Sequence, residues 1–449
     1  MLTTILILFN KTITLICKLL GKNGSVFPGS IVYPKDEHIL EKIKYPKYVI
    51  GISGSSGKGS TTALVANILS TAGYSVCWNE SGSNGIFAAI TLILNNAKLN
   101  HHFKHDILLL ELDERHIKLI FKKNILTHLL VTNITRDQPA RNAHPDMIFN
   151  ELFESIGDDT HLIINADDPI VSKIRLSHKG LISTFGISKT IDSYKKSELN
   201  SVDQAYCPKC HSKLKYTYYH YGHLGSYKCP RGDFGRDLID YEAKDVNLSK
   251  KRFKIKKDTI NINKDILYEV YSTTAAFALC SEIGVSKEQI LYALNEGDIH
   301  SKRGKVYSLN NRSVNILESK NENALSYYQS LKYITSRKGN KTVILGFDNV
   351  SRRYEYNDLS WLWDVEFELL EDPNIDKIIC IGRFKYDIAN RLVYAGIKEE
   401  KLILVDDINS LFDIAKEKSK GTIFTMVCFD MSAIIKNMLK EGESIHENS

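Results

Sequence analysis

The sequence lacks a strong excess of charge of either sign. Its 449 residues include 59 Lys and Arg against 53 Asp and Glu, which gives a formal net charge of +6. Proteins that bind nucleic acid through its phosphates concentrate basic residues in one patch or have a strongly basic domain. We therefore expect no nucleic-acid partner. The mild positive bias fits an anionic substrate or an anionic membrane surface.

A long apolar run is also missing. The N-terminal segment, residues 2–21, is apolar, but it contains Lys11 and Lys18, and its longest unbroken run covers only residues 5–9. A membrane-spanning helix needs about 20 apolar residues, and a signal peptide places its basic residues before the apolar run. Two interpretations stay open: a helix packed on the protein, which we favour, and an amphipathic helix that rests on a membrane surface.

Cysteines are too few and too unevenly spread for a disulfide-built domain. Three of the eight lie in one short stretch: Cys207, Cys210 and Cys229. This distribution is typical of a reducing cytoplasm, and the clustered cysteines indicate a metal site. The sequence has no internal repeats, and its length predicts two or three domains.

Short apolar runs alternate with helical patterns through most of the chain. Segments 47–53 (KYVIGIS) and 105–113 (HDILLLELD) are typical of buried parallel strands. The alternation predicts a doubly wound α/β sheet, in which ligands bind beyond the carboxyl ends of the strands. We predict four parts: an N-terminal segment (1–46), a first α/β domain (47–299), an insertion within it (200–236), and a smaller second α/β domain (300–449).

A loop rich in glycine and serine follows the first strand and opens a helix. Glycines let backbone N–H groups close around phosphate oxygens, and the helix N-terminus adds positive potential. Lys58, expected to face solvent, can reach the outer phosphates, and a hydroxyl of Ser60 or Thr61 can bind Mg²⁺. We assign nucleotide binding to the whole loop: Gly54, Ser55, Ser56, Gly57, Lys58, Gly59, Ser60 and Thr61.

This loop resembles that of the Mur ligases and folylpolyglutamate synthases, because only two residues separate Gly54 from Gly57. Further similar segments follow in order: LLLELDE (108–114), VTNITRDQPAR (131–141) and NADDP (165–169). The resemblance implies a Mur-ligase-type ATP-binding domain in which Glu111 and Ser60 bind Mg²⁺ and Asn133 contacts the nucleotide. We interpret Glu114 as a solvated acid at the start of a helix.

The second domain is similar to that of the MurT family, the ligase subunits of lipid II isoglutaminyl synthases. Three segments carry this resemblance: KN (320–321), DLSWLWD (358–364) and the stretch from Gly382 to Gly396. A zinc-ribbon-like insertion is also typical of the family. The resemblance adds Arg303 and Lys320 to the nucleotide contacts. It further implies that Asp358, or else Asp364, is offered to the active site of a glutaminase partner.

The resemblance implies an ATP-dependent amidation. The γ-phosphate of ATP would convert the α-carboxylate of D-glutamate in the lipid II stem peptide to an acyl phosphate, and ammonia would displace the phosphate. Lys58 and Mg²⁺ would neutralise charge on the phosphates. Ammonia would come from a separate GatD-type glutaminase subunit, since no cysteine of this chain lies in a nucleophile-elbow context. The enzyme would act in the cytoplasm, with lipid II at the inner membrane face.

Several positions depart from the family pattern. Gly59 follows the loop lysine, as in the folate enzymes, and Pro139-Ala140 interrupts the usual stretch. Glu269 and Ser272 replace asparagines of a nucleotide-contacting helix, and Lys305 replaces a glutamate. Two alternatives therefore stay open: an amino-acid ligase of the folylpolyglutamate type, and a nucleotide-binding scaffold that has lost catalysis.

The cysteine insertion has an incomplete ligand pattern. Cys207 and Cys210 form one knuckle, and Cys229 begins a second in which Gly232 stands in place of the fourth cysteine. A structural zinc site needs a closed tetrahedral shell. The fourth ligand is a water or one of four nearby side chains: His211, His220, His223 or Asp233. The alternative is a ribbon that has lost its metal.

Two further features of the DLSWLWD segment are open to ordinary structural explanations. Trp361 and Trp363 lie two residues apart, so in an extended segment they would share a face, and core or interface packing is expected. Asp358 is alternatively a turn or helix-cap residue, because the sequence around it is turn-like.

Overall fold

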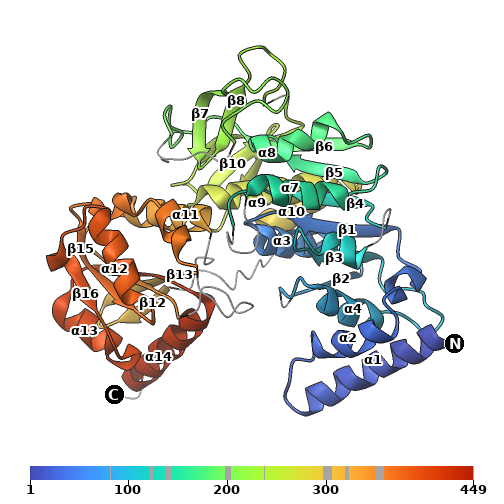
Figure 1. Cartoon of the computed structure of the whole chain (residues 1–449), viewed down its shortest axis with the longest axis horizontal. Helices are drawn as coiled ribbons and strands as arrows, with labels where there is room; N and C mark the ends of the chain where they lie inside the picture. Colours follow the sequence, from blue (N-terminus) through green and yellow to red (C-terminus); the bar gives the residue numbers. More distant parts are fainter. Residues whose placement is uncertain are drawn as a thin grey trace. The chain divides into compact units, whose positions relative to one another are not determined.

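The computed structural model describes most of the chain and arranges it in two compact units (Figure 1). The described residues are 1–80, 82–121, 125–137, 144–197, 204–236, 238–296, 306–318, 323–348 and 358–447. Unit 1 comprises residues 1–134, 145–197 and 202–299, and unit 2 comprises residues 135–144, 198–201 and 300–449.

Unit 1 is built on a nine-stranded sheet with the order β11-β10-β9-β6-β5-β4-β1-β3-β2. Its strands are β1 Tyr48–Ser53, β2 Val76–Trp78, β3 Ile107–Glu111, β4 His128–Val131, β5 His161–Asn165, β6 Ile182–Ile187, β9 Tyr241–Asn247, β10 Arg252–Ile255 and β11 Asp258–Asn261. The strands from β2 to β9 in this order are parallel. β10 and β11 extend the sheet in antiparallel fashion. The predicted doubly wound sheet is confirmed, and its antiparallel edge is an addition that the sequence reasoning missed.

Helices cover both faces of this sheet. They are α1 Leu2–Leu19, α2 Phe27–Val32, α3 Lys58–Thr71, α4 Ile86–Asn95, α5 Ile117–Ile120, α7 Pro145–Glu154, α8 Pro169–Ser172, α9 Leu267–Glu282 and α10 Lys287–Asn295. Leu108, Leu110 and Leu129 project from one face into a core that includes residues of α1, α2, α4, α7 and α8. α3, α9 and α10 pack together as a second group. The central strands are therefore buried on both faces, which explains their nearly continuous apolar sequence.

The insertion forms a separate hairpin of β7 Lys215–Tyr221 and β8 Leu224–Lys228, at the top of Figure 1. It has a small core of its own: Cys207, Leu214, Tyr227, Cys229 and Phe234. This core is too small to stabilise a domain, so the hairpin depends on further contacts.

Unit 2 contains a six-stranded sheet with the order β12-β13-β17-β14-β15-β16. Its strands are β12 Val306–Leu309, β13 Arg312–Glu318, β14 Lys341–Gly346, β15 Ile375–Ile381, β16 Leu402–Leu404 and β17 Thr422–Val427. Its helices are α11 Ala324–Thr335, α12 Lys385–Tyr394, α13 Leu411–Lys418 and α14 Phe429–Glu447, with 3-10 helices η4 Ser360–Asp364 and η5 Phe367–Glu371. The β12–β13 pair is antiparallel and the remaining pairs are parallel.

Candidate active site

The predicted phosphate loop lies between β1 and α3. β1 ends at Ser53, and α3 begins at Lys58 with Gly57 as its N-cap at φ +81°. Gly54 has φ +129°, and a Cβ there would come within 2.3 Å of the Thr132 hydroxyl oxygen. Both glycines are therefore required by the backbone. The loop opens a 14-residue helix, so backbone N–H groups and the positive end of the helix converge on it.

Asn133, two residues after the neighbouring strand β4, braces this loop. Its carbonyl oxygen accepts a hydrogen bond from Ser55 N at 2.8 Å, and its side-chain oxygen accepts from Ser56 N at 3.1 Å. Its side-chain nitrogen donates to Ser56 O at 3.0 Å. Asn133 therefore fixes the conformation of the loop at Ser55 and Ser56. Its contact with the nucleotide stays a prediction.

Lys58 and Glu114 form a buried ion pair, which corrects two expectations. Lys58 is only 8% exposed and Glu114 only 4%. Lys58 Nζ donates to Glu114 Oε1 at 2.9 Å and also to the Gly54 carbonyl, while Glu114 Oε1 accepts from Gly54 N at 3.1 Å. Lys58 therefore does not face solvent, and Glu114 is not a solvated acid. Burying either charge alone would be costly, so the two are buried as a pair.

Sequence reasoning missed this role of Glu114, although a signal for it exists. β3 pairs with β1 in parallel, with Glu111 opposite Ile52, so the residues after both strands meet at the same edge of the sheet. Glu114 follows β3 by three residues and Gly54 follows β1 directly. An acid at this position is therefore within reach of the phosphate loop.

The predicted magnesium ligands lie at the same edge. Glu111 is the last residue of β3, and its backbone N–H donates to Asn79 Oδ1 at 2.8 Å. Thr61 is buried and its hydroxyl donates to Gly57 O at 2.9 Å, whereas Ser60 is half-buried near the start of α3. Hydroxyl and carboxylate oxygens suit Mg²⁺. Of the two hydroxyls, the geometry favours Ser60.

A buried aspartate links the phosphate loop to the insertion. Asp168, which follows β5, accepts hydrogen bonds from Ile134 N at 2.8 Å and from Ile170 N at 2.7 Å, so it caps α8 and fixes the residue after Asn133. His223, in the β7–β8 turn, places Nε2 3.3 Å from Asp168 Oδ1. The insertion therefore contacts the turn that supports Asn133.

The neighbouring Asp167 anchors the same hairpin. It is fully buried and accepts hydrogen bonds from Arg236 Nε at 2.5 Å, Tyr271 OH at 2.7 Å and Ile187 N at 2.8 Å. Burial acts to lower the pKa of Arg236, but the Asp167 carboxylate raises that pKa above its usual range. Burial lowers the pKa of His220, whose Nε2 lies 3.0 Å from Ile187 O. His220 and His223 thus belong to this network and not to the cysteine knuckles.

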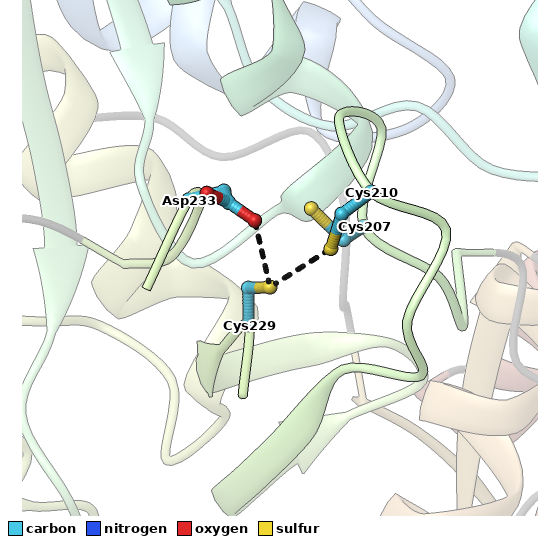
Figure 2. Close-up of side chains that lie close together, drawn as sticks. All are labelled: Cys207, Cys210, Cys229 and Asp233. Atoms are coloured by element: carbon cyan, nitrogen blue, oxygen red, sulfur yellow. Dashed lines mark hydrogen bonds between the residues drawn. The ribbon is translucent and has the colours of Figure 1, made fainter. Parts of the chain in front are cut away.

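The three cysteines converge with one carboxylate (Figure 2). One ligand atom each from Cys207, Cys210, Cys229 and Asp233 can be chosen so that all lie within 4.8 Å of one another. The sulfurs of Cys210 and Cys229 are 3.4 Å apart, and Asp233 Oδ2 is 3.8 Å from the Cys229 sulfur. Three thiolates and a carboxylate are a competent tetrahedral set for zinc. Among the four side chains considered from the sequence, the geometry selects Asp233.

Comparison with known proteins agrees with these features. A model of the Mur ligase middle domain matches residues 52–228, and a model described as MurT ligase C-terminal matches residues 320–430. The Staphylococcus aureus (strain COL) protein named lipid II isoglutaminyl synthase (glutamine-hydrolyzing) subunit MurT is 27% identical over 400 residues, which cover 86% of each chain. A Streptococcus pneumoniae protein of the same name is 26% identical over 450 residues, covering 99% of this chain and 98% of its own. The chain is a divergent member of the MurT family.

The fold is similar to that of a pseudomurein peptide ligase type C from Methanothermus fervidus. The TM-score is 0.68 at 20% identity, over 90% of this chain and 80% of that one. As a MurT-family member with a Mur ligase middle domain, the chain is an ATP-dependent ligase. The loop between β1 and α3 is the part of this domain whose geometry suits a nucleotide phosphate.

In the MurT-type second unit, Asp358 precedes η4. Asp358 Oδ1 accepts a hydrogen bond from Ser360 N at 2.9 Å, which is the turn contact considered from the sequence. Trp361 is buried in the core, whereas Trp363 is 59% exposed. The two tryptophans do not share a face, because the segment is a 3-10 helix and not the extended segment for which a shared face was expected. Asp364 Oδ1 accepts from Arg136 Nη1 at 2.9 Å.

Some predicted positions lie outside the described residues. They are Arg303, Lys305, Lys320, Asn321 and Pro139-Ala140. On α9, Glu269 accepts hydrogen bonds from Asn263 N and Lys264 N, both at 2.8 Å, so its carboxylate stabilises the turn before the helix. Ser272 is buried, and its hydroxyl would lie 3.8 Å from a Cβ on Gly57. α9 therefore lies against the phosphate loop although Glu269 and Ser272 replace the family's asparagines.

Proposed function

We propose that this chain amidates the α-carboxyl of D-glutamate in the stem peptide of lipid II, with ATP as the energy source. The observation that carries the proposal is the phosphate loop between β1 and α3, with Lys58 and Glu111 at one sheet edge, in a chain that also has a MurT-type second unit. Two relatives over most of the chain are named as subunits of lipid II isoglutaminyl synthase.

The chemistry requires activation of the carboxylate. A carboxylate oxygen attacks the γ-phosphorus of ATP, ADP leaves, and an acyl phosphate forms. Ammonia then attacks the acyl carbon, phosphate leaves with the C–O bond electrons, and a proton is lost to give the amide. The loop N–H groups and Lys58 hold the phosphates and stabilise the charge that develops on them. Mg²⁺, held by Ser60 and Glu111, would supply further charge neutralisation.

The Lys58–Glu114 pair gives the loop lysine a defined resting position. With Glu114 accepting from both Lys58 Nζ and Gly54 N, the ammonium is held at the loop before nucleotide arrives. A bound phosphate would place a second anion within reach of the same ammonium. Glu114 is thus a positioning residue for Lys58.

Ammonia is supplied by a partner in this proposal. The word subunit in the relatives' names supports assembly with another chain, and we assign the partner as a GatD-type glutaminase. Asp358 would orient the histidine of that glutaminase, since a cysteine–histidine pair needs a third group to hold the imidazole. Cys207, Cys210, Cys229 and Asp233 would hold a structural zinc ion in the insertion.

The test is a reconstituted reaction of the purified chain with lipid II, ATP, Mg²⁺ and ammonium chloride. We expect ADP formation that depends on lipid II, together with an amidated product identified by mass spectrometry. Product that requires an added amino acid in place of ammonium would instead support the folylpolyglutamate-type ligase. Nucleotide binding without ADP formation under either condition would support the scaffold alternative.

A further inference from the structure

The N-terminal helix α1 turns several polar side chains toward the protein and a row of large apolar side chains outward. Its buried face includes polar side chains, namely Thr3, Asn10 and Thr14. Asn10 Nδ2 donates to Thr91 O at 3.2 Å and to Asn95 Oδ1 at 2.9 Å, both on α4. Lys11 donates to the Ala97 carbonyl just after α4. These specific contacts, together with the buried Leu6 and Ile7, fix α1 on the protein.

The outward face of α1 is apolar instead. Its large apolar side chains are 39–79% exposed: Leu2, Ile5, Leu8, Phe9, Leu15, Ile16 and Leu19. These positions recur at spacings of three and four, so they form one stripe along the whole helix, interrupted only by Thr12. Leu20, Val26 and Phe27 extend it toward α2, which packs against α1. A contiguous apolar stripe of this length marks an interaction surface.

The charged side chains of residues 1–35 all have one sign. The first 35 residues contain no Asp or Glu, whereas Lys11, Lys18, Lys22 and Lys35 lie within them. By helical position, Lys11 and Lys18 lie seven residues apart on one border of the stripe, and Lys22 follows the helix. An apolar stripe bordered by lysines complements the acyl–headgroup boundary of an anionic bilayer.

We infer that the outward face of α1 docks on an anionic membrane surface, with the helix axis parallel to the bilayer. Among the described residues, α1 is the one helix long and apolar enough, by length and composition, to cross a membrane. A span would break the Asn10 contacts with α4 and remove Leu6 and Ile7 from the core. A second copy would bring the same lysines of two chains together without an acid on either helix. Docking on a bilayer surface buries the apolar stripe and leaves the Asn10 contacts with α4 and the packing of Leu6 and Ile7 intact.

The test is flotation of the full chain with two kinds of vesicle, one of phosphatidylcholine alone and one that also contains phosphatidylglycerol. We expect binding to the anionic vesicles, and a partition coefficient at least about tenfold lower for the triple variant Ile5→Gln, Leu8→Gln, Leu15→Gln. The matched control removes three exposed apolar side chains elsewhere, Leu181→Gln, Ile191→Gln and Leu238→Gln, and should bind as the parent does. Replacing Lys18 and Lys22 by Gln should weaken binding by about fivefold for each lysine.

Four results would overturn the inference. They are equal binding by the α1 triple variant and the parent, equal binding to both vesicle types, resistance of the membrane-bound chain to alkaline carbonate, and an α1-dependent dimer in sedimentation that binds no vesicles. Unchanged melting temperature and nucleotide affinity of the triple variant show that it is folded. The assay needs no ligase activity, so its failure is distinct from failure of the proposed reaction.

Discussion

The buried Lys58–Glu114 pair has consequences for both stability and catalysis. Lys58→Ala should abolish the proposed ATP-dependent amidation, because it would remove a cation expected to stabilise charge on the phosphates, and such contacts contribute several kcal/mol in the transition state. It also leaves Glu114 buried without the ammonium that neutralises it, and this should cost about 3–5 kcal/mol of unfolding free energy. Urea denaturation measures the second effect and an ADP-release assay the first.

A charge-matched variant separates these two effects. Glu114→Gln in the Lys58→Ala background removes the uncompensated charge and retains an oxygen that can accept from Gly54 N. We expect it to recover most of the lost stability and none of the activity. The partly exposed pair Lys42–Asp36 is the comparison, since Lys42→Ala should cost no more than about 1 kcal/mol. A double variant as unstable as Lys58→Ala would show that the pair is not the cause.

Asp358 offers a second test at the level of a single residue. Asp358→Asn keeps the size of the side chain and an oxygen that can accept from Ser360 N, so the start of η4 should be preserved. We expect a sharp loss of glutamine-driven amidation and normal amidation with added ammonium, because only the ammonia supply depends on the carboxylate. Equal loss with both nitrogen sources would place Asp358 in the ligase site or the scaffold. Full activity with glutamine would shift the assignment to Asp364.

At the level of elements, parallel strands were predictable and antiparallel edges were not recognised. β1 and β3 are continuous apolar runs, which is the pattern of strands buried on both faces. β10 and β11 bury only alternate residues, such as Phe253 and Ile260, and carry polar residues such as Lys254 and Asn261 on the other face. Alternation over four residues is a short signal that a polar loop also produces, so these strands need the sheet edge beside them to be identified.

The side chains of the site show a similar division. The phosphate loop could be predicted because it is local: strand, glycines and helix are consecutive in sequence. Glu114 and Asp233 could not be assigned in the same way, because their partners are fixed by tertiary contacts. Asp233 is one residue beyond Gly232, the position that cysteine spacing indicates, and only the folded knuckle shows that its carboxylate reaches the Cys229 sulfur.

The cysteine knuckles should bind one zinc ion per chain, measured by elemental mass spectrometry. Cys229→Ser should lower both the zinc content and the melting temperature, because structural metal binding is coupled to folding. Asp233→Ala should speed zinc loss to a chelator, whereas Lys209→Ala, on the first knuckle, should not. Chelator-free protein with less than about a tenth of an equivalent of zinc would support the metal-free ribbon.

The free energy of unfolding should decrease in acid because of a buried histidine, His128, at the start of β4. His128 and His161 are paired across these strands, and burial, followed by the nearby His161, lowers the pKa of His128 to about 4. The unfolded chain binds this proton near pH 6.5, so the folded state loses stability as pH falls from about 6.5 to about 4. The loss reaches on the order of 3 kcal/mol. His128→Gln should flatten this part of the stability–pH curve in urea denaturation, and the exposed His102→Gln should not. A variant with the parent's slope would remove His128 as the cause.

At the scale of the whole molecule, contacts run continuously from the insertion to the phosphate loop within unit 1. Tyr227, on β8, donates to the Ala166 carbonyl at 3.2 Å, and Gly225 N donates to the Asp167 carbonyl at 2.9 Å. Together with the His223–Asp168 contact, these bonds hold the turn after β5 from the insertion side. Asp168 also accepts a hydrogen bond from the backbone N–H of Ile134, the residue after Asn133. The hairpin is therefore connected to the phosphate loop through the turn after β5 and Asn133.

His223→Ala should consequently weaken nucleotide binding, although His223 lies outside the phosphate loop. Loosening Asp168 frees Ile134 N and the backbone of Asn133, so the loop spends less time in its binding conformation, and coupling of this kind changes affinity by roughly 2- to 30-fold. Calorimetric titration with ADP should show the weaker binding, and the KM for ATP should rise more than kcat falls. His223→Asn, which keeps a polar N–H group near the Asp168 carboxylate, should recover part of the affinity, and Lys215→Ala at the exposed start of β7 should leave it unchanged. If His223→Ala lowered the melting temperature yet bound ADP as the parent does, the hairpin would have a structural role only.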